Sequence, residues 1–276
     1  MKQVIFSNPW RTFFEELGFH GFKDFFDAFE GTQINKNTKR SVLTRTFEQG
    51  PQSRTFFLKR FFNPHFKDML FALYNWRRPC SQGRLEWNSA NYLLSHGIGS
   101  YRPACFGEIS ILGVERRSFF LTEKLPGMSM TDFLKQNWST LNTRRQEKFL
   151  SALARFIQKI HGLGVSLPDL YVYHIFVEQC KLGVNADGKE DAYSFAVIDL
   201  HRMSINVPSW RIPAARVENL ARLSFSLRDD YISSAQRQLL LRQSLNDLPE
   251  SKIDDMIEKI LRRSDQLRHR RKQPVY

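Results

Sequence analysis

Three polar side chains in the second half of the sequence have the types and spacing that phosphoryl transfer requires. Asp169 follows a long amphipathic stretch, His174 comes five positions later, and Asp199 ends the apolar segment FAVID. Transfer of a phosphoryl group from ATP needs a carboxylate near the attacking hydroxyl and ligands for magnesium. The spacing therefore predicts Asp169 as a catalytic carboxylate and His174 and Asp199 as ligands of Mg²⁺.

A cation for the phosphates of ATP is predicted in the first half of the sequence. Lys59 lies inside the apolar stretch TFFLKRFF, and Glu86 opens a helical pattern 27 residues later. An ion pair between the two would hold the ammonium where it reaches phosphate oxygens. Glu123 and Leu125 end a strand-like stretch before a Pro-Gly break, so their backbone is expected to bind adenine. Taken singly, Lys59 and Glu86 also fit an edge-strand lysine and a solvated helix glutamate. His174 alone fits a core histidine as well, and Asp199 alone fits a turn or cap residue at a strand end.

The elements that must position Lys59 and Glu86, in the first half of the sequence, are mostly strands. Residues 41–48 and 54–62 predict a hairpin around a Gly-Pro turn. Residues 63–81 are a basic amphipathic insertion, and residues 84–96 predict a helix. FGEISIL and RSFFLTEKL predict two more strands around Gly113. Many of the 24 phenylalanines cluster in this part, so we expect either an aromatic core or an apolar surface there.

The second half is predicted to be mainly helical around a few short strands. Met130–Trp138 and residues 143–161 predict helices, the second from a single apolar stripe. LYVYHIFV, CKLGV and YSFAVIDL predict strands, with a polar NADGKED turn before the last, and helical patterns return after Pro213 until a basic tail. Together with the phosphoryl-transfer residues, this order predicts a two-lobed, α+β, protein-kinase-like fold. Its small antiparallel-sheet lobe would be residues 1–125 and its helical lobe residues 126–276.

Composition limits the class of protein and its partners. No run approaches the roughly 20 apolar residues of a membrane span, and the N-terminus lacks the pattern of a signal peptide. Three widely spaced cysteines are typical of reduced thiols in a cytoplasmic protein. The net charge of +13 indicates an anionic partner. Since no zinc-finger, RNP or basic-zipper pattern accompanies that charge, nucleic acid is not an expected partner.

At these positions the sequence resembles the lipopolysaccharide core kinases, the Kdo/heptose kinase family. FFLKRFF is similar to a lysine-arginine strand of that family, LEWNSANYLLSHGI to an N-E-W-like helix, and TEKL to a T-E-E-L-like hinge. PDLYVYHIFV is similar to the catalytic segment H-R-D-x-Y-L-x-H-F-L, and VIDLHR is present intact. RVENLARLSFSL resembles the later segment R-V-K-D-L-A-x-L-x-F-S. The resemblance covers residues 42–230.

The resemblance implies an ATP-dependent kinase that phosphorylates a sugar hydroxyl of an anionic, lipid-linked saccharide. It would act at the cytoplasmic face of the inner membrane. Lys59 would contact the phosphates and Glu86 would hold it in place. Asp169 would orient and deprotonate the sugar hydroxyl, His174 would replace the usual asparagine as metal ligand, and Asp199 would hold magnesium.

Three departures from the family pattern qualify that reading. Leu167-Pro168 replaces the His-Arg before the catalytic Asp, so ionic anchoring of that loop by an arginine is expected to be missing. Glu218-Asn219 replaces Lys-Asp, which is consistent with the first change because a bracing Asp without the arginine would be an unpaired buried charge. No G-x-G-x-x-G precedes Lys59, so Asn35, Lys36 and Lys39 are candidates for covering the phosphates.

Other readings of the sequence remain open. A pseudokinase would keep the fold and the nucleotide without transferring phosphate, and an active kinase could use a small metabolite or a protein as acceptor. Residues 60–78 and the basic stretch Arg262–Lys272 together have the composition of a peripheral contact with anionic membrane. A helix packed on the first lobe and a solvated tail explain the same residues equally well.

Overall fold

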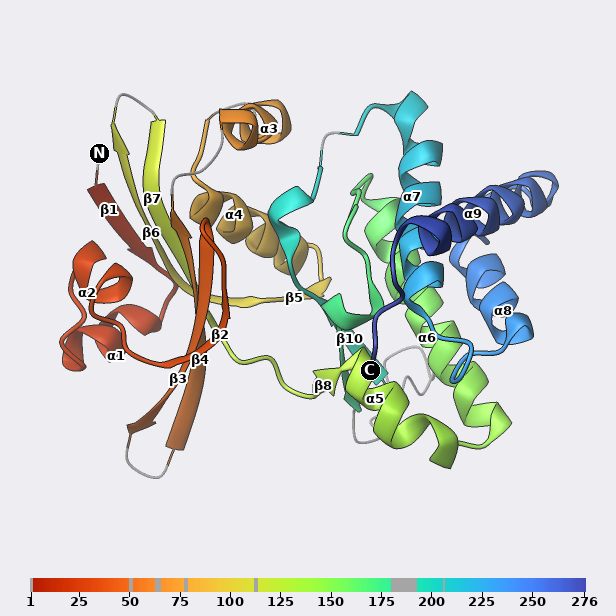
Figure 1. The fold of residues 1–276 in the computed structure, drawn as a ribbon, viewed down its shortest axis with the longest axis horizontal. Helices are drawn as coiled ribbons and strands as arrows, with labels where there is room; N and C mark the ends of the chain where they lie inside the picture. Colours follow the sequence, from red (N-terminus) through yellow and green to blue (C-terminus); the bar gives the residue numbers. More distant parts are fainter. Residues whose placement is uncertain are drawn as a thin grey trace. The chain divides into compact units, whose positions relative to one another are not determined.

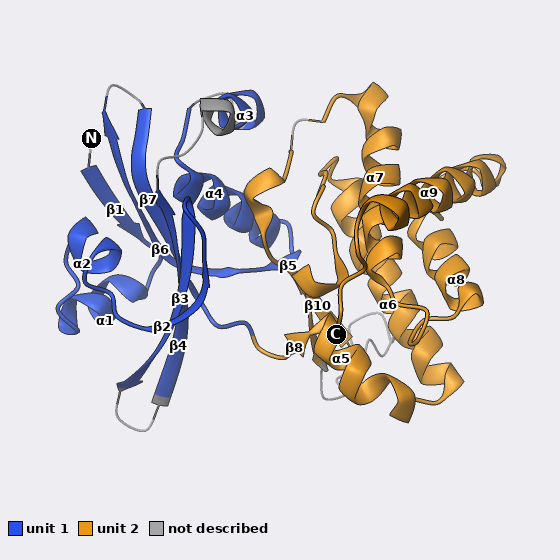
Figure 2. Ribbon diagram, viewed as in Figure 1, with its two compact units in different colours: residues 1–125 blue, residues 126–276 orange. Residues whose placement is uncertain are grey.

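The computed structural model describes residues 2–49, 52–62, 66–76, 79–111, 114–179, 193–205 and 207–276 of the chain. Two compact units divide the chain, residues 1–125 and residues 126–276 (Figure 2). Each unit has its own sheet and its own set of helices (Figure 1).

The centre of the first unit is an antiparallel sheet in which six strands lie in the order β1-β6-β7-β4-β3-β2, counted over the described residues (Figure 1). The strands are β1 (Lys2–Phe6), β2 (Thr32–Lys36), β3 (Arg40–Gln49), β4 (Gln52–Phe62), β6 (Arg102–Ile111) and β7 (Val114–Glu123), and a short β5 (Gly99–Ser100) precedes β6. The predicted hairpin is confirmed because β3 pairs with β4 along its whole length. The strands predicted around Gly113 are confirmed as β6 and β7, although Gly113 itself lies outside the described residues.

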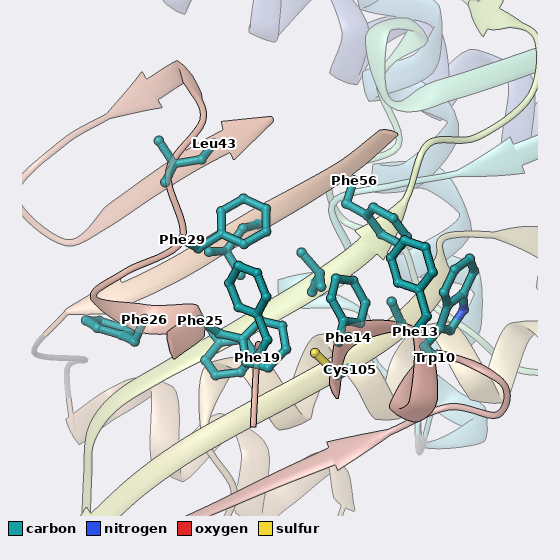
Figure 3. Close-up of a cluster of buried hydrophobic side chains, with 14 of the residues drawn as sticks. Trp10, Phe13, Phe14, Phe19, Phe25, Phe26, Phe29, Leu43, Phe56 and Cys105 are labelled. Carbon is teal, nitrogen blue, oxygen red and sulfur yellow. The ribbon is translucent and has the colours of Figure 1, made fainter. Parts of the chain in front are cut away.

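An aromatic core fills one face of this sheet (Figure 3). Phe56 and Leu58 of β4 share that face because side chains alternate along a strand, and both are fully buried. Two short helices, α1 (Trp10–Glu16) and α2 (Phe22–Phe26), supply most of the facing rings. The Phe14 ring lies at the centre of the cluster, 5.0 Å from the ring centroid of Phe56. The expected aromatic core is therefore confirmed.

The sequence predicts no element within the first 36 residues, where the structure contains β1, α1, α2 and β2. The two helices have only 7 and 5 residues, so neither repeats an apolar position often enough to show a helical period. Their phenylalanines instead pack against one face of the sheet and cover it. This part of the fold depends on tertiary packing rather than on local pattern.

The helix α4 (Gln82–Ser95) covers the opposite face of the sheet and confirms the helix predicted over 84–96. Ser81 caps it by accepting a hydrogen bond from the Arg84 amide at 3.1 Å. Gly83 lets the first turn approach β7, since a Cβ there would lie 2.5 Å from the Phe119 carbonyl oxygen. The preceding helix α3 (Phe66–Trp76) forms part of the predicted insertion 63–81, whose remaining residues are only partly described.

The second unit is mostly helical, as predicted. Its helices are α5 (Met130–Asn137), α6 (Thr143–Gly162), α7 (Ile212–Ser226), α8 (Ser234–Ser244) and α9 (Glu250–Arg270). Among the described residues three short strands accompany them, β8 (Met128–Ser129), β9 (Ile175–Gln179) and β10 (Tyr193–Val197), and β9 lies in the middle. Phe149 of α6 packs between Phe133 and Tyr193, with ring centroids 4.8 and 5.0 Å away.

The strand predicted over LYVYHIFV is wrong in its first half. Val172–His174 forms a turn of 3₁₀-helix, η2, and the strand β9 begins only at Ile175. The Val172 amide donates to a side chain of α7 instead of to a strand, which explains why an apolar run did not become a β-strand here. The predicted strand CKLGV and the NADGKED turn lie outside the described residues.

The basic C-terminal residues are not a solvated tail. They continue α9 as far as Arg270, because Ile253, Ile257, Ile260 and Leu267 form one buried stripe on that helix. Several of the arginines face carboxylates of the same unit, including Arg263 with Glu218 at 2.7 Å. The stretch is therefore a packed element whose charge is partly neutralised.

Candidate active site

The strand β4 places Lys59 on the face opposite Leu58, toward α4. There its ammonium donates to both carboxylate oxygens of Glu86, at 2.8 and 2.9 Å. The Glu86 side chain is 0% exposed and that of Lys59 is 16% exposed. The Tyr101 hydroxyl lies 3.3 Å from the same ammonium. The predicted ion pair is thus present, and burial makes each charge depend on the other.

The two residues predicted to bind adenine lie at the end of the first unit. The Glu123 carboxylate faces Arg54 at 3.1 Å and Arg102 at 3.9 Å, so its side chain is held against the sheet. The amide of Lys124 donates to the Thr55 carbonyl at 2.8 Å and is therefore already used by the sheet. Leu125 is buried. A role of Glu123 and Leu125 in binding adenine remains a prediction.

In the second unit, Asp169 lies in the loop between α6 and η2. Its Oδ1 accepts hydrogen bonds from Arg222 at 3.0 Å and from Arg202 at 3.1 Å. Its other oxygen, Oδ2, lies 3.9 Å from His201 Nε2, beyond hydrogen-bond distance. The Asp169 side chain is 14% exposed. The carboxylate is thus oriented through one oxygen, and Asp169 lines a small pocket together with Leu167, Pro168, His174 and Asp199.

The orientation of His174 is set by the backbone of Asp169. His174 Nδ1 lies 2.8 Å from the Asp169 carbonyl oxygen, which can only accept, so Nδ1 carries a proton and, in a neutral imidazole, Nε2 has the lone pair. That Nε2 lies 3.6 Å from Asp199 Oδ2. A magnesium ion binds its ligands at about 2.0–2.1 Å, so both atoms are close enough to bind one ion. The donor set therefore fits the predicted metal, although nitrogen is a less common partner for Mg²⁺ than oxygen.

Asp199 has a left-handed backbone conformation, with φ 62° and ψ 59°, at the end of β10. Asp tolerates this region better than most residues because its short side chain makes local hydrogen bonds. Asp199 Oδ1 lies 3.1 Å from His201 Nδ1 in the following 3₁₀ turn, η3 (Leu200–Arg202). The turn thereby directs the second carboxylate oxygen, Oδ2, toward His174.

Tyr173 lies beside these groups with its ring stacked on Tyr171, at a centroid distance of 5.1 Å. Burial, followed by the neighbouring Tyr171 and the carboxylates of Asp169 and Asp199, raises the pKa of Tyr173 to about 12. The phenol therefore stays neutral at physiological pH. It can donate a hydrogen bond there but cannot act as an anionic base.

The expected loss of ionic anchoring in the catalytic loop is wrong. Pro168, not an arginine, directly precedes Asp169. Arg222 nevertheless reaches the Asp169 carboxylate from α7, 53 residues further along the chain. Arg222 lies in RVENLARLSFSL, a segment whose sequence points to the missing carboxylate but not to this arginine. A charged residue between Leu220 and Leu223, both fully buried, was the available signal, because such a charge needs a buried partner.

The structure brings the predicted site residues together in two groups. Lys59 and Glu86 are paired in the first unit, and Asp169, His174 and Asp199 share one pocket in the second. Of the residues considered for covering phosphates, Asn35 and Lys36 lie on the exposed strand β2. Lys39 lies in the tight turn that follows, where its amide donates to Asn37.

Comparison with known proteins agrees with this arrangement. The family model "Lipopolysaccharide kinase (Kdo/WaaP) family" matches residues 29–243. The lipopolysaccharide core heptose(I) kinase WaaP of Escherichia coli K12 is 29% identical over 193 residues, which cover 67% of this chain and 71% of that protein. WaaP of Pseudomonas aeruginosa is 25% identical over 225 residues, 80% of each chain.

A solved structure described as WaaP in complex with acyl carrier protein matches this chain with a TM-score of 0.66. The match covers 96% of this chain and 99% of that one at 22% sequence identity. At that sequence identity the match supports the fold alone. The predicted α+β, protein-kinase-like fold is confirmed.

Proposed function

The chain belongs to the lipopolysaccharide kinase (Kdo/WaaP) family and is a phosphotransferase with an alcohol acceptor, and we propose that it transfers the γ-phosphate of ATP to a sugar hydroxyl of the lipopolysaccharide core, on heptose or Kdo. The observation that carries the proposal is the geometry around Asp169. One oxygen of its carboxylate is fixed by two guanidinium groups, and Asp169 lines the same pocket as His174 and Asp199. His174 and Asp199 lie beside it with donor atoms turned toward each other.

In the proposed reaction, the acceptor hydroxyl attacks the γ-phosphorus as its proton passes to Asp169 Oδ2. The bond between the γ-phosphorus and the bridging oxygen breaks, and ADP leaves with that electron pair. Lys59, held by Glu86, would bind the phosphates of ATP. Glu123 and Leu125 would contribute backbone contacts to adenine.

His174 Nε2 and a carboxylate oxygen of Asp199 would hold magnesium. The ion would supply positive charge to the phosphate oxygens when bound. The protein's part is to present these two donors in a fixed relation. The hydrogen bond from His174 Nδ1 to the Asp169 carbonyl does this, because it fixes both the tautomer and the ring plane.

The direct test is transfer of labelled γ-phosphate to purified lipopolysaccharide core that lacks the phosphate. Asp169→Ala is expected to lower the transfer rate about 10²–10⁴-fold, the usual contribution of a general base. Asp230→Ala is the matched control, since Asp230 also faces an arginine but is exposed. Turnover that survives Asp169→Ala would contradict the assignment. Nucleotide binding without any transfer by the unmodified protein would favour the pseudokinase.

The proposed acceptor also implies a location for the reaction. The net charge of +13 suits a phosphorylated, lipid-linked saccharide at the cytoplasmic face of the inner membrane. No helix in the described part of the chain has both the length and the apolar composition of a membrane span. The helix α3 exposes Leu70, Leu73 and Tyr74, a surface suited to peripheral contact with lipid.

Flotation with anionic vesicles tests that contact. The protein is expected to float with the vesicles at low salt, and Leu70→Glu together with Leu73→Glu is expected to keep it in the bottom fraction. Floating of the double variant at the level of the parent protein would count against α3 as the contact. Because the solved WaaP structure contains acyl carrier protein, that protein is a second partner to test.

A further inference from the structure

The helix α7 turns one polar face toward the loop that carries Asp169. Asn219, Arg222 and Ser226 lie three and seven positions apart along the helix, so they project from the same side. All three are buried. Each contacts a different part of the loop, so the helix and the loop are joined at three points.

Asn219 and Ser226 hold the two ends of the loop. The Asn219 amide is assigned the orientation in which its nitrogen donates to the Leu167 carbonyl and its oxygen accepts from the Leu167 amide, both at 3.0 Å. Ser226 Oγ accepts from the Val172 amide at 2.9 Å and donates to the Leu223 carbonyl at 2.9 Å. These contacts fix the backbone on both sides of Asp169.

Between these two contacts, Arg222 holds the side chain of Asp169. One guanidinium nitrogen, Nη1, donates to Asp169 Oδ1 at 3.0 Å and to the Tyr171 hydroxyl at 3.3 Å. The other edge of the same guanidinium contacts Glu218 Oε1, from Nε at 2.8 Å and Nη2 at 2.7 Å. Because its side chain is only 9% exposed, Arg222 has little freedom to leave this position. Arg202 also contacts Asp169 Oδ1, but it is 51% exposed and so is held less firmly.

The C-terminal residues complete the arrangement. Arg263 of α9 donates to Glu218 Oε2 at 2.7 Å, so Glu218 is shared between two arginines. Arg271, just after α9, donates to the Tyr171 hydroxyl at 3.0 Å. The two groups that position Arg222 are therefore themselves positioned by the end of the chain.

We propose that Arg222 is the positioning residue for Asp169. It supplies from α7 the guanidinium that the family pattern places directly before the catalytic aspartate. The proposal rests on the proposed function of Asp169. By holding Oδ1, Arg222 directs Oδ2 toward the acceptor hydroxyl. A carboxylate freed from it would rotate and sample orientations in which Oδ2 does not meet the hydroxyl.

The test compares Arg222→Ala, Arg222→Lys and Arg216→Ala in the full chain. Arg216 is a suitable control because it is a buried arginine of the same helix. It makes a two-point ion pair with Asp247, at 2.7 and 3.1 Å, away from the loop. Misplacement of a catalytic group by about 1 Å lowers a rate on the order of 10²-fold, so we expect Arg222→Ala to lower kcat about 10- to 100-fold. The KM for ATP is expected to change by less than about 2-fold, because ground-state binding is untouched.

Arg222→Lys is expected to have an intermediate kcat, since an ammonium still reaches Asp169 but cannot also contact Glu218 at two points. Arg216→Ala is expected to keep kcat near that of the parent protein. An equal loss of kcat in Arg222→Ala and Arg216→Ala would overturn the proposal, because the effect would then be general destabilisation. A kcat in Arg222→Ala within about 2-fold of the parent would overturn it as well.

Hydrogen exchange separates this proposal from the proposed function, because it needs no acceptor. Peptides spanning residues 166–174 are expected to exchange faster in Arg222→Ala than in the parent or in Arg216→Ala. If the parent protein transfers phosphate to no acceptor, the proposed function fails, while a selective loss of protection would still show that Arg222 braces the loop. Unchanged protection in Arg222→Ala would overturn the brace itself.

Discussion

Replacement of Lys59 by methionine removes the ammonium from a carboxylate that has no contact with solvent. Both oxygens of Glu86 accept from Lys59, and the Glu86 side chain is 0% exposed. Removal of one partner from a buried ion pair costs about 3–5 kcal/mol, because the remaining charge loses its partner and gains no water. We therefore expect Lys59→Met to lower the free energy of unfolding of the first unit by about that amount.

The double variant Lys59→Met/Glu86→Leu, in contrast, is expected to be nearly as stable as the parent protein. Replacement of both charges by apolar side chains of similar volume is often neutral, since neither charge then has to be removed from water. We expect the double variant to lie within about 1 kcal/mol of the parent protein in stability. Both variants are expected to lose phosphoryl transfer, because each lacks the cation for the phosphates of ATP. Stability and activity are thus predicted to separate at this pair.

Native-state hydrogen exchange at the amides of β4 and α4 measures the free energy of opening of this unit without requiring the whole chain to unfold in one step. Arg11→Met serves as the control, because Arg11 and Glu15 form an exposed pair that should contribute less than about 1 kcal/mol. A double variant as unstable as Lys59→Met would refute the reasoning. So would a cost for Lys59→Met no larger than that of the control.

Two further predictions concern the stability of the second unit. Burial, and then the charge of Arg216, lowers the pKa of His161 to about 3 from 6.5, so the unfolded chain binds a proton that the folded chain does not. The free energy of unfolding should therefore fall by about 1.4 kcal/mol per pH unit between pH 6 and 4 on account of His161. Urea unfolding of His161→Gln should lack that part of the slope, and an identical pH profile would show that His161 does not cause it. Gly127 has φ 78°, and a Cβ there would lie 2.1 Å from the Val177 carbonyl oxygen. Gly127→Ala should lower the urea denaturation midpoint clearly more than Gly164→Ala. Gly164 has a similar φ but open space around it, so its replacement should cost only about 1–2 kcal/mol of unfolding free energy. Equal losses in the two variants would contradict the steric argument.

Local sequence was enough to predict most of the elements after residue 40 and the residues of the candidate site. The apolar stripe of α6 and the turn residues between strands are short-range signals, so the helix and the hairpin that depend on them were predictable. The offset between Asp169 and His174 is likewise local. A single hydrogen bond from the ring of His174 to the Asp169 backbone explains why that spacing matters.

The tertiary structure decided what holds these residues in place. Arg222 reaches Asp169 across 53 residues, and Arg271 reaches Tyr171 across 100. A charge among apolar residues can indicate that Arg222 is buried, but no local signature names its partner, because only folding brings that partner near. The first two helices were missed for the same reason, since they are too short to show a period and exist because their phenylalanines cover the sheet. Sequence therefore predicted the candidate reacting groups, while only long-range packing brought Arg222 to Asp169 and Arg271 to Tyr171.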